Sequence, residues 1–305
     1  MSPAHAGQLA ALGAATCWSF SALAFDAAAR RIGPLVLNLI RLVLAFGFLT
    51  LLAWALRGLP LPVDASPRAW AWLAVSGLVG FVFGDFCLFR AFLAIGPRLS
   101  MLMMSLAPPL TAVIGWLLLG ETLNGKDFAG MVLTVTGIAW AVLERKRPAE
   151  PGDAERDAPA GRPSLAGICF GFCGALGQAA GLVLSKLGMG DYDAVAATQV
   201  RVVAGVAGYA LLFLVFHWWP RVAPALRDGR ALGFAAVGAF FGPCVGVSLS
   251  LYAVHRTVSG VAASLMALTP VLLIPLVVLL RRERVGIGGV AGALVAVAGV
   301  ALLFL

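Results

Sequence analysis

The pattern of hydrophobic positions divides the chain into ten apolar windows joined by short polar connections. Within each window the apolar residues are continuous, which disfavours the alternating strands of a membrane β-barrel. A membrane-spanning α-helix needs about 20 predominantly apolar residues, and the windows have about that length. The pattern predicts an all-α integral membrane protein with ten transmembrane helices, at 7–25, 35–56, 69–92, 100–119, 128–143, 165–184, 194–216, 231–253, 260–280 and 285–304.

The two halves of the chain repeat one pattern, because residues in and after the fourth window return in and after the ninth, 162 positions later. Five helices per half is an odd number, so the second half must enter the membrane upside down relative to the first. We therefore expect two inverted repeats, 1–147 and 164–305, joined by a polar linker, 148–163. The matched residues are Pro108 with Pro270, Glu121 with Glu283, Gly80 with Gly242 and Gly84 with Gly246.

Composition agrees with a membrane protein, because 61% of the residues are hydrophobic and only 12% are charged. The formal net charge of +8 would suggest a nucleic-acid partner for a soluble protein, but here the basic residues lie in connections and report orientation. With the N-terminus outside, the cytoplasmic connections hold fourteen Lys and Arg residues and the opposite ones hold five. We expect a multi-pass protein of the inner (plasma) membrane with both termini outside and no nucleic-acid partner.

Charged residues within the windows are few, and such residues commonly mark binding sites or ion paths because they are costly in a bilayer. Arg41 and Asp85 lie at similar depths in the second and third helices, so an ion pair is geometrically possible. Arg201 has the same depth in the seventh helix as Arg41 in the second, but Val247 stands where Asp85 has its repeat partner. Arg90 lies nearer the interface, where it can snorkel to water.

Arg201 must find polar partners other than a carboxylate, and Ser248, Tyr252 and His255 lie at the right end of the eighth helix. An arginine without a fixed carboxylate can bind an anionic group of a substrate, or it can hold helix ends in register. Asp85 could carry a proton, although a pairing with Arg41 would oppose this. The sequence therefore leaves open whether transport is coupled to protons.

Uncharged polar residues and prolines complete the features of the apolar windows. Asn38, Gln178 and Gln199 could bind a substrate or bond neighbouring helices. Prolines remove backbone donors, so we expect kinks that face the protein interior or a cavity. The prolines concerned are Pro108, Pro109, Pro270 and Pro275.

Motifs of enzymes and ATP-driven pumps are absent from the sequence, which has no GxSxG, HExxH or GxxxxGK[ST]. The five cysteines lie within windows with no companions that complete a metal-ligand set, so we expect no metal or cofactor. These absences leave secondary transport, with a facilitator or channel-like permease as the alternative. An intramembrane lipid-modifying enzyme that uses Asp85 and His255 is a more distant one.

Trp18-Ser-Phe near the middle of the first helix, Pro108 and Pro270 in the fourth and ninth, and Glu121 and Glu283 after them resemble the EamA-type branch of the drug/metabolite transporter superfamily. The resemblance implies a central cavity lined by the first, third and fourth helices of each half and reached alternately from either face. It also implies export of a small amino-acid-like or amphipathic solute.

One departure from internal symmetry is that Gln178 stands in the second half where the first has Trp18, so the two cavity walls differ chemically. The implied partners are a small-molecule substrate and the lipid bilayer. The candidate cavity residues are Trp18, Asn38, Arg41, Asp85, Ser105, Gln178, Gln199, Arg201, Tyr252 and His255.

Overall fold

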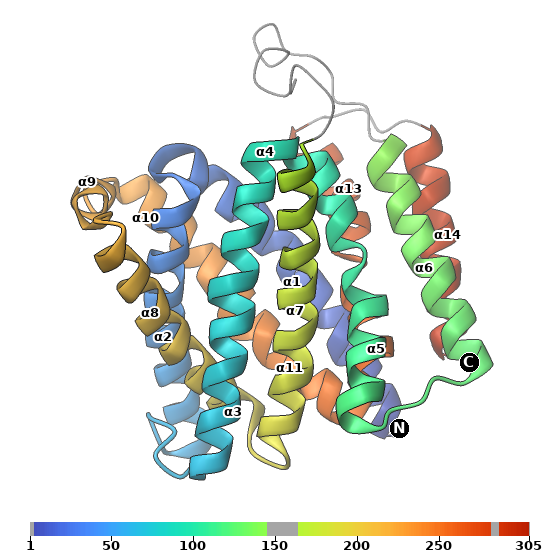
Figure 1. Cartoon of the computed structure of the whole chain (residues 1–305), viewed down its shortest axis with the longest axis horizontal. Coiled ribbons are helices and arrows are strands. Elements are labelled where there is room, and N and C mark those ends of the chain that lie inside the picture. Colours follow the sequence, from blue (N-terminus) through green and yellow to red (C-terminus); the bar gives the residue numbers. More distant parts are fainter. Residues whose placement is uncertain (1–2, 145–163, 282–286, 305) are drawn as a thin grey trace, which may run out of the picture.

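The computed structural model describes residues 3–144, 164–281 and 287–304, and all regular structure in these ranges is helical. The helices stand side by side as a bundle (Figure 1). Seven helical stretches are each long and apolar enough to cross a membrane, which confirms an all-α membrane protein. The count of ten stays a prediction. The seven stretches are Ala4–Ile32, Pro34–Arg57, Pro67–Ile95, Leu99–Leu119, Leu165–Met189, Ala194–Val215 and Gly229–Arg256.

The first repeat begins with two long helices joined by a single residue, Gly33, whose φ of 78° is a conformation that favours glycine. The third predicted span is not one regular helix, because a π-helical segment interrupts it. The elements are α1 (Pro3–Ile32), α2 (Pro34–Arg57), α3 (Pro67–Gly77), η1 (Leu78–Gly84), α4 (Asp85–Met104), α5 (Ala107–Leu119) and α6 (Gly125–Glu144).

The second repeat follows the same order, except that two short helical turns are added after its second long helix and the counterpart of α4 is divided into two helices, Val247–Arg256 and Ser259–Met266. The elements are α7 (Leu165–Met189), α8 (Ala194–Val215), η2 (Trp219–Arg221), α9 (Val222–Ala225), α10 (Gly229–Ala239), η3 (Phe240–Gly246), α11 (Val247–Arg256), α12 (Ser259–Met266), α13 (Thr269–Arg281) and α14 (Ile287–Phe304).

Irregular backbone occurs at matching positions of the two repeats. The π-helical segments η1 and η3 are 162 residues apart at both ends, and η3 includes Pro243. The breaks between α4 and α5 and between α12 and α13 have the same separation. A π-helical turn is wider than an α-helical turn and shifts the backbone N–H and C=O groups from their α-helical positions. Such segments are frequent at functional sites.

The predicted proline kinks are chain breaks that precede the prolines. Pro108 and Pro109 lie in the first turn of α5, and Pro270 lies in the first turn of α13. In a first turn the missing N–H has no helical partner, so proline starts a helix there without bending it. Pro275 lies inside α13.

Packing between the repeats is reciprocal: α3, η1 and α4 lie against α7, and α10, η3 and α11 lie against α1. The Ser76 hydroxyl on α3 donates to the Gly181 carbonyl on α7 at 2.8 Å. At the matching crossing the hydroxyl is on the other helix, and Ser21 on α1 donates to the Gly238 carbonyl on α10 at 2.9 Å. In addition, α2 packs on α8 and α6 on α14.

Two ends of the bundle carry the polar connections. The Gly33 face holds the α1–α2 turn at Gly33, η2 and α9, and the Glu121 face holds Glu121, residues 190–193 and the start of α1 (Figure 1). α10 begins beside Arg31 on the Gly33 face, where Arg31 pairs with Asp228 at 2.7 Å. Its continuation, α11, ends on the Glu121 face, whereas α3 and α4 run the opposite way (Figure 1).

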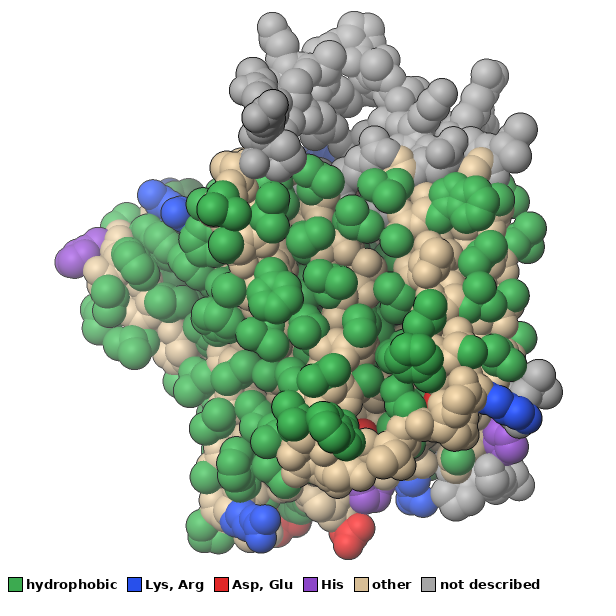
Figure 2. Space-filling model, turned by 45° about the vertical axis from the view of Figure 1, so that its right-hand side comes forward, with side chains coloured by type: hydrophobic (Ala, Val, Ile, Leu, Met, Phe, Trp, Pro, Cys, Tyr) green, Lys and Arg blue, Asp and Glu red, His purple; other side chains and the backbone are tan. Residues whose placement is uncertain are grey.

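The outer surface between these ends is apolar. Figure 2 shows hydrophobic side chains over the middle of one view, with charged side chains mainly towards its ends. Trp116 and Leu117 on α5 and Leu214 on α8 are exposed in the described structure. A lipid environment explains such side chains, which water would not favour.

Candidate functional site

An ion pair between Arg41 of α2 and Asp85, the first residue of α4, is buried inside the bundle. Both side chains are about nine-tenths buried. Gln178 of α7 donates its Nε2 to Asp85 Oδ1 at 2.8 Å and to the Gly80 carbonyl at 3.3 Å. The Arg41–Asp85 pair, which the sequence showed to be geometrically possible, is thus present, and the carboxylate is held by groups from both repeats.

Glycines allow the two repeats to approach at this site. A Cβ atom on Gly177 of α7 would lie 2.7 Å from the Gly84 Cα atom, and one on Gly181 would lie 2.9 Å from the Gly80 Cα atom. Gly80 and Gly84 belong to η1, directly before Asp85. The contact between η1 and α7 therefore brings Gln178 within reach of Asp85.

Arg201 of α8 is a second buried cation beside the pair. It is 5% exposed, and its guanidinium carbon lies 4.8 Å from the centroid of the Phe81 ring, a cation–π contact. Among the described residues no hydrogen bond or ion pair reaches the guanidinium, and its buried Nε has no acceptor. Asp85 acts on it electrostatically, but Arg41 already pairs with that carboxylate.

The site therefore contains two buried guanidinium groups and one carboxylate, a local excess of one positive charge if all three are ionised. A buried charge is stable only when it is paired, because little water is present to solvate it. An anionic group placed at Arg201 would complete the pairing and accept hydrogen bonds from a rigid, planar donor.

The prediction that Ser248, Tyr252 or His255 would contact Arg201 was wrong. Ser248 bonds Cys244 and Thr198, and Tyr252 lies under the guanidinium of Arg256. His255 Nε2 is 3.9 Å from Asp191 at the surface of the Glu121 face. These residues have a suitable depth in the membrane, but their contacts lie elsewhere.

The remaining candidates occupy separate places. Asn38 Nδ2 donates to the Tyr209 hydroxyl at 2.9 Å, one helical turn from Arg41. Gln199 donates to Thr50 Oγ1 and to the Pro60 carbonyl, which are structural contacts between α8 and the end of α2.

Trp18 and Ser105 belong to two other parts of the fold. Trp18 packs against η3, where a Cβ atom on Gly246 would lie 3.4 Å from the indole nitrogen of Trp18. Ser105 lies at the break between α4 and α5 and donates to the Leu102 carbonyl at 2.7 Å. Their role in a cavity stays a prediction.

A polar cluster on the Glu121 face was not predicted from the sequence. Glu121 Oε1 lies 2.5 Å from Lys186 Nζ, and its carboxylate accepts hydrogen bonds from the Ser259 backbone N–H at 2.8 Å and hydroxyl at 3.0 Å. Lys186 also donates to the Thr257 carbonyl at 2.7 Å. The cluster ties the end of α5 in the first repeat to α7 and α12 in the second. The recurrence of Glu121 as Glu283 was the signal that could have drawn attention to it.

The helical bundle with its apolar outer surface and buried polar residues is that of a polytopic membrane protein. The model of the EamA-like transporter family matches residues 5–143 and 165–305, one match per repeat. The chain belongs to the EamA-like transporter family, as the resemblance indicated, and its two repeats are those of that family.

Comparison with solved structures shows that the fold of this chain is shared by other proteins. Among the solved structures that match, one crystal structure has a TM-score of 0.75 and 20% sequence identity, and the match covers 97% of this chain and 95% of the other. At that identity the likeness shows a shared fold. No curated protein matches the chain.

Proposed function

We propose that this protein is a secondary transporter that moves a small, amino-acid-like or amphipathic metabolite with an anionic group by alternating access, without ATP. The observation that carries the proposal is Arg201, a nearly fully buried guanidinium that lacks a carboxylate partner among the described residues. An arginine in this state is favoured where a ligand supplies the missing negative charge. Export is the direction that the family resemblance implies.

Contacts between the repeats support alternating access. On the Glu121 face, α5 and α12 are in close contact, and a Cβ atom on Gly260 would lie 2.8 Å from the Ala112 Cβ. The ion pair between Glu121 and Lys186 adds a polar tie at the same end. We propose that this conformation is closed at the Glu121 face.

The membrane topology belongs to the same proposal. We propose ten transmembrane helices in two inverted halves, with both termini outside. The Gly33 face then lies on the cytoplasmic side of the inner membrane. The distribution of Lys and Arg supports this orientation. The reciprocal packing of α3–α4 on α7 and of α10–α11 on α1 supports the inversion.

Uptake of radiolabelled amino acids and organic acids into proteoliposomes, with and without an imposed pH gradient, tests the proposal. We expect saturable transport of one anionic or zwitterionic class and loss of it in Arg201→Ala and Arg41→Ala, both still inserted in the membrane. Normal transport by both variants would show that the cavity assignment is wrong. Acceleration by the gradient would implicate proton coupling.

A facilitator is the second candidate function, since the described cluster offers a binding site without a demonstrated coupling group. Accumulation of substrate against its gradient separates a coupled carrier from a facilitator or channel. The intramembrane-enzyme alternative loses its support, because Asp85 pairs with Arg41 in the centre of the bundle while His255 lies beside Asp191 at the surface.

A further inference from the structure

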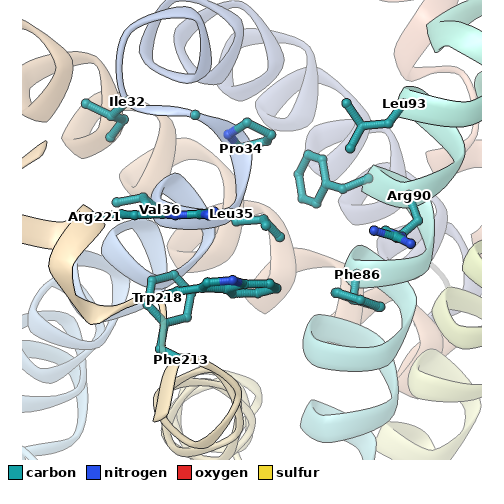
Figure 3. A pocket seen from close by; sticks show the side chains of 12 residues that line it. Ile32, Pro34, Leu35, Val36, Phe86, Arg90, Leu93, Phe213, Trp218 and Arg221 are labelled. Carbon is teal, nitrogen blue, oxygen red and sulfur yellow. The ribbon is translucent and has the colours of Figure 1, made fainter. Parts of the chain in front are cut away.

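The cavity on the Gly33 face is distinct in composition from the buried centre. It is lined by the α1–α2 turn from Ile32 to Val36, by Phe86, Arg90 and Leu93 on one face of α4, and by Trp218 and Arg221 after α8 (Figure 3). Neither Arg41, Asp85, Gln178 nor Arg201 lines it. Its volume of about 440 Å³ lies in the range of small-molecule sites.

Two arginines give this cavity its charge. Arg90 contacts the Phe170 ring, with its guanidinium carbon 5.5 Å from the ring centroid, and Arg221 contacts the Trp218 ring at 5.8 Å. Within the described ranges no carboxylate pairs with either arginine. The acids Asp26 and Asp228 on this face pair with Arg30 and Arg31 instead.

The first turn of α2 adds to the positive potential. No side chain caps this helix at Gly33, and Leu35 and Val36 of its first turn line the cavity. The N-terminal end of a helix carries a partial positive charge from its free N–H groups. Arg90, Arg221 and this helix end therefore all favour a negatively charged occupant.

The rest of the wall is apolar and reaches the outer surface. Phe86, Phe89 and Leu93 follow one another along α4, and Leu93 is 78% exposed. Trp218 stands on the opposite side (Figure 3), and tryptophan is typical of the zone where lipid headgroups meet acyl chains. A cationic part beside an apolar part that faces lipid matches a phospholipid.

We propose that this cavity binds an anionic phospholipid, with the phosphate between Arg90 and Arg221 and the first acyl carbons along Phe86 and Leu93. Basic pockets between transmembrane helices on the cytoplasmic side bind such headgroups, and the orientation proposed above places the Gly33 face there. The site would be occupied by a lipid that the protein does not transport.

Native mass spectrometry of the full chain in non-ionic detergent, equilibrated with equal amounts of phosphatidylglycerol and phosphatidylcholine, tests this proposal. We expect preferential retention of phosphatidylglycerol by the unmodified protein. Replacing both arginines, in Arg90→Gln/Arg221→Gln, should lower its affinity by roughly 30-fold, the factor that two arginines at an anionic surface supply. The matched control, Arg227→Gln/Arg230→Gln, removes two arginines of the same face that do not line the cavity and should leave retention unchanged.

Two further measurements separate a lipid from other anions. Leu93→Trp fills the apolar rim without changing charge and should also reduce retention of phosphatidylglycerol. Glycerol phosphate, which lacks acyl chains, should compete poorly. Equal retention by the double variant and its control, or displacement by glycerol phosphate as effective as that by phosphatidylglycerol, would overturn the proposal. Because the readout is bound lipid, it is independent of whether transport is found.

Discussion

Arg41 and Arg201 lie at the same depth in the second long helix of their repeats, yet their replacement is expected to affect the stability of the protein differently. Arg41 pairs with a buried carboxylate, whereas Arg201 has only the Phe81 ring as a described partner. Arg41→Gln removes the hydrogen-bonded ion-pair partner of Asp85, although Arg201 still acts on that carboxylate electrostatically, and breaking a buried pair costs about 3 to 5 kcal/mol. Because Gln178 still donates to Asp85, we expect a loss near the lower end, about 3 kcal/mol.

Arg201→Gln removes a buried charge to which no described carboxylate is hydrogen-bonded, so the free energy of unfolding should stay the same or rise. Its effect should appear in substrate binding. A hydrogen bond to a charged group contributes about 1.5 to 3 kcal/mol. The apparent affinity for an anionic substrate should therefore fall by about 10- to 100-fold.

Two assays on the same preparations decide between these roles: thermal unfolding in detergent, and concentration-dependent uptake into proteoliposomes. Arg41→Gln should lower the melting temperature, and Arg201→Gln should raise the substrate concentration needed for half-maximal uptake. The reasoning would be refuted if Arg201→Gln destabilised the protein as much as Arg41→Gln and left uptake kinetics unchanged. Arg201 would then be a structural residue.

Gly177→Ala is expected to destabilise the protein by about 1 to 3 kcal/mol, since its Cβ would lie 2.7 Å from the Gly84 Cα. Gly233→Ala, with open space around its Cβ, should be neutral or stabilising in the same unfolding assay. A double-mutant cycle of Glu121→Gln and Lys186→Met should give a coupling of about 1 to 3 kcal/mol, and a value below about 0.5 would contradict the tie. Burial, together with the hydrogen bond to Asp64, raises the pKa of the Tyr192 phenol from 10 to about 12. The stability that the protonated phenol contributes is therefore fully present below pH 10 and is lost as the pH rises from there to about 12. Ultraviolet titration should show this phenol in the difference between wild type and Tyr192→Phe, and ionisation near pH 10 would contradict it.

The helices were largely predictable from the sequence because a bilayer imposes a minimum apolar length on each span. The depth of a residue follows from the 1.5 Å rise of an α-helix, and this was enough to show that an Arg41–Asp85 pair was possible. Depth does not fix the direction in which a side chain points around its helix. For that reason Tyr252 and His255, at a suitable level, were wrongly expected to meet Arg201.

Other parts of the site depend on contacts that no local pattern encodes. The π-helical segment η1 needs a particular packing of α3 and α4 on α7, and its apolar sequence reads as an ordinary helix. Glu121 reads as a solvated loop residue, because its partners Lys186 and Ser259 come from the other repeat. Only the folded chain brings them together.

The single acid of the central site has a thermodynamic consequence for the cycle. If two inverted halves were identical in sequence, exchanging their conformations would give two states of equal energy. Asp85 in one half and Val247 in the other remove that equality, because the ion pair belongs to one half alone. The empty protein should therefore populate one state in preference to the other. Such a bias sets which side is open at rest, while the solute and ion gradients alone decide the direction of net flow.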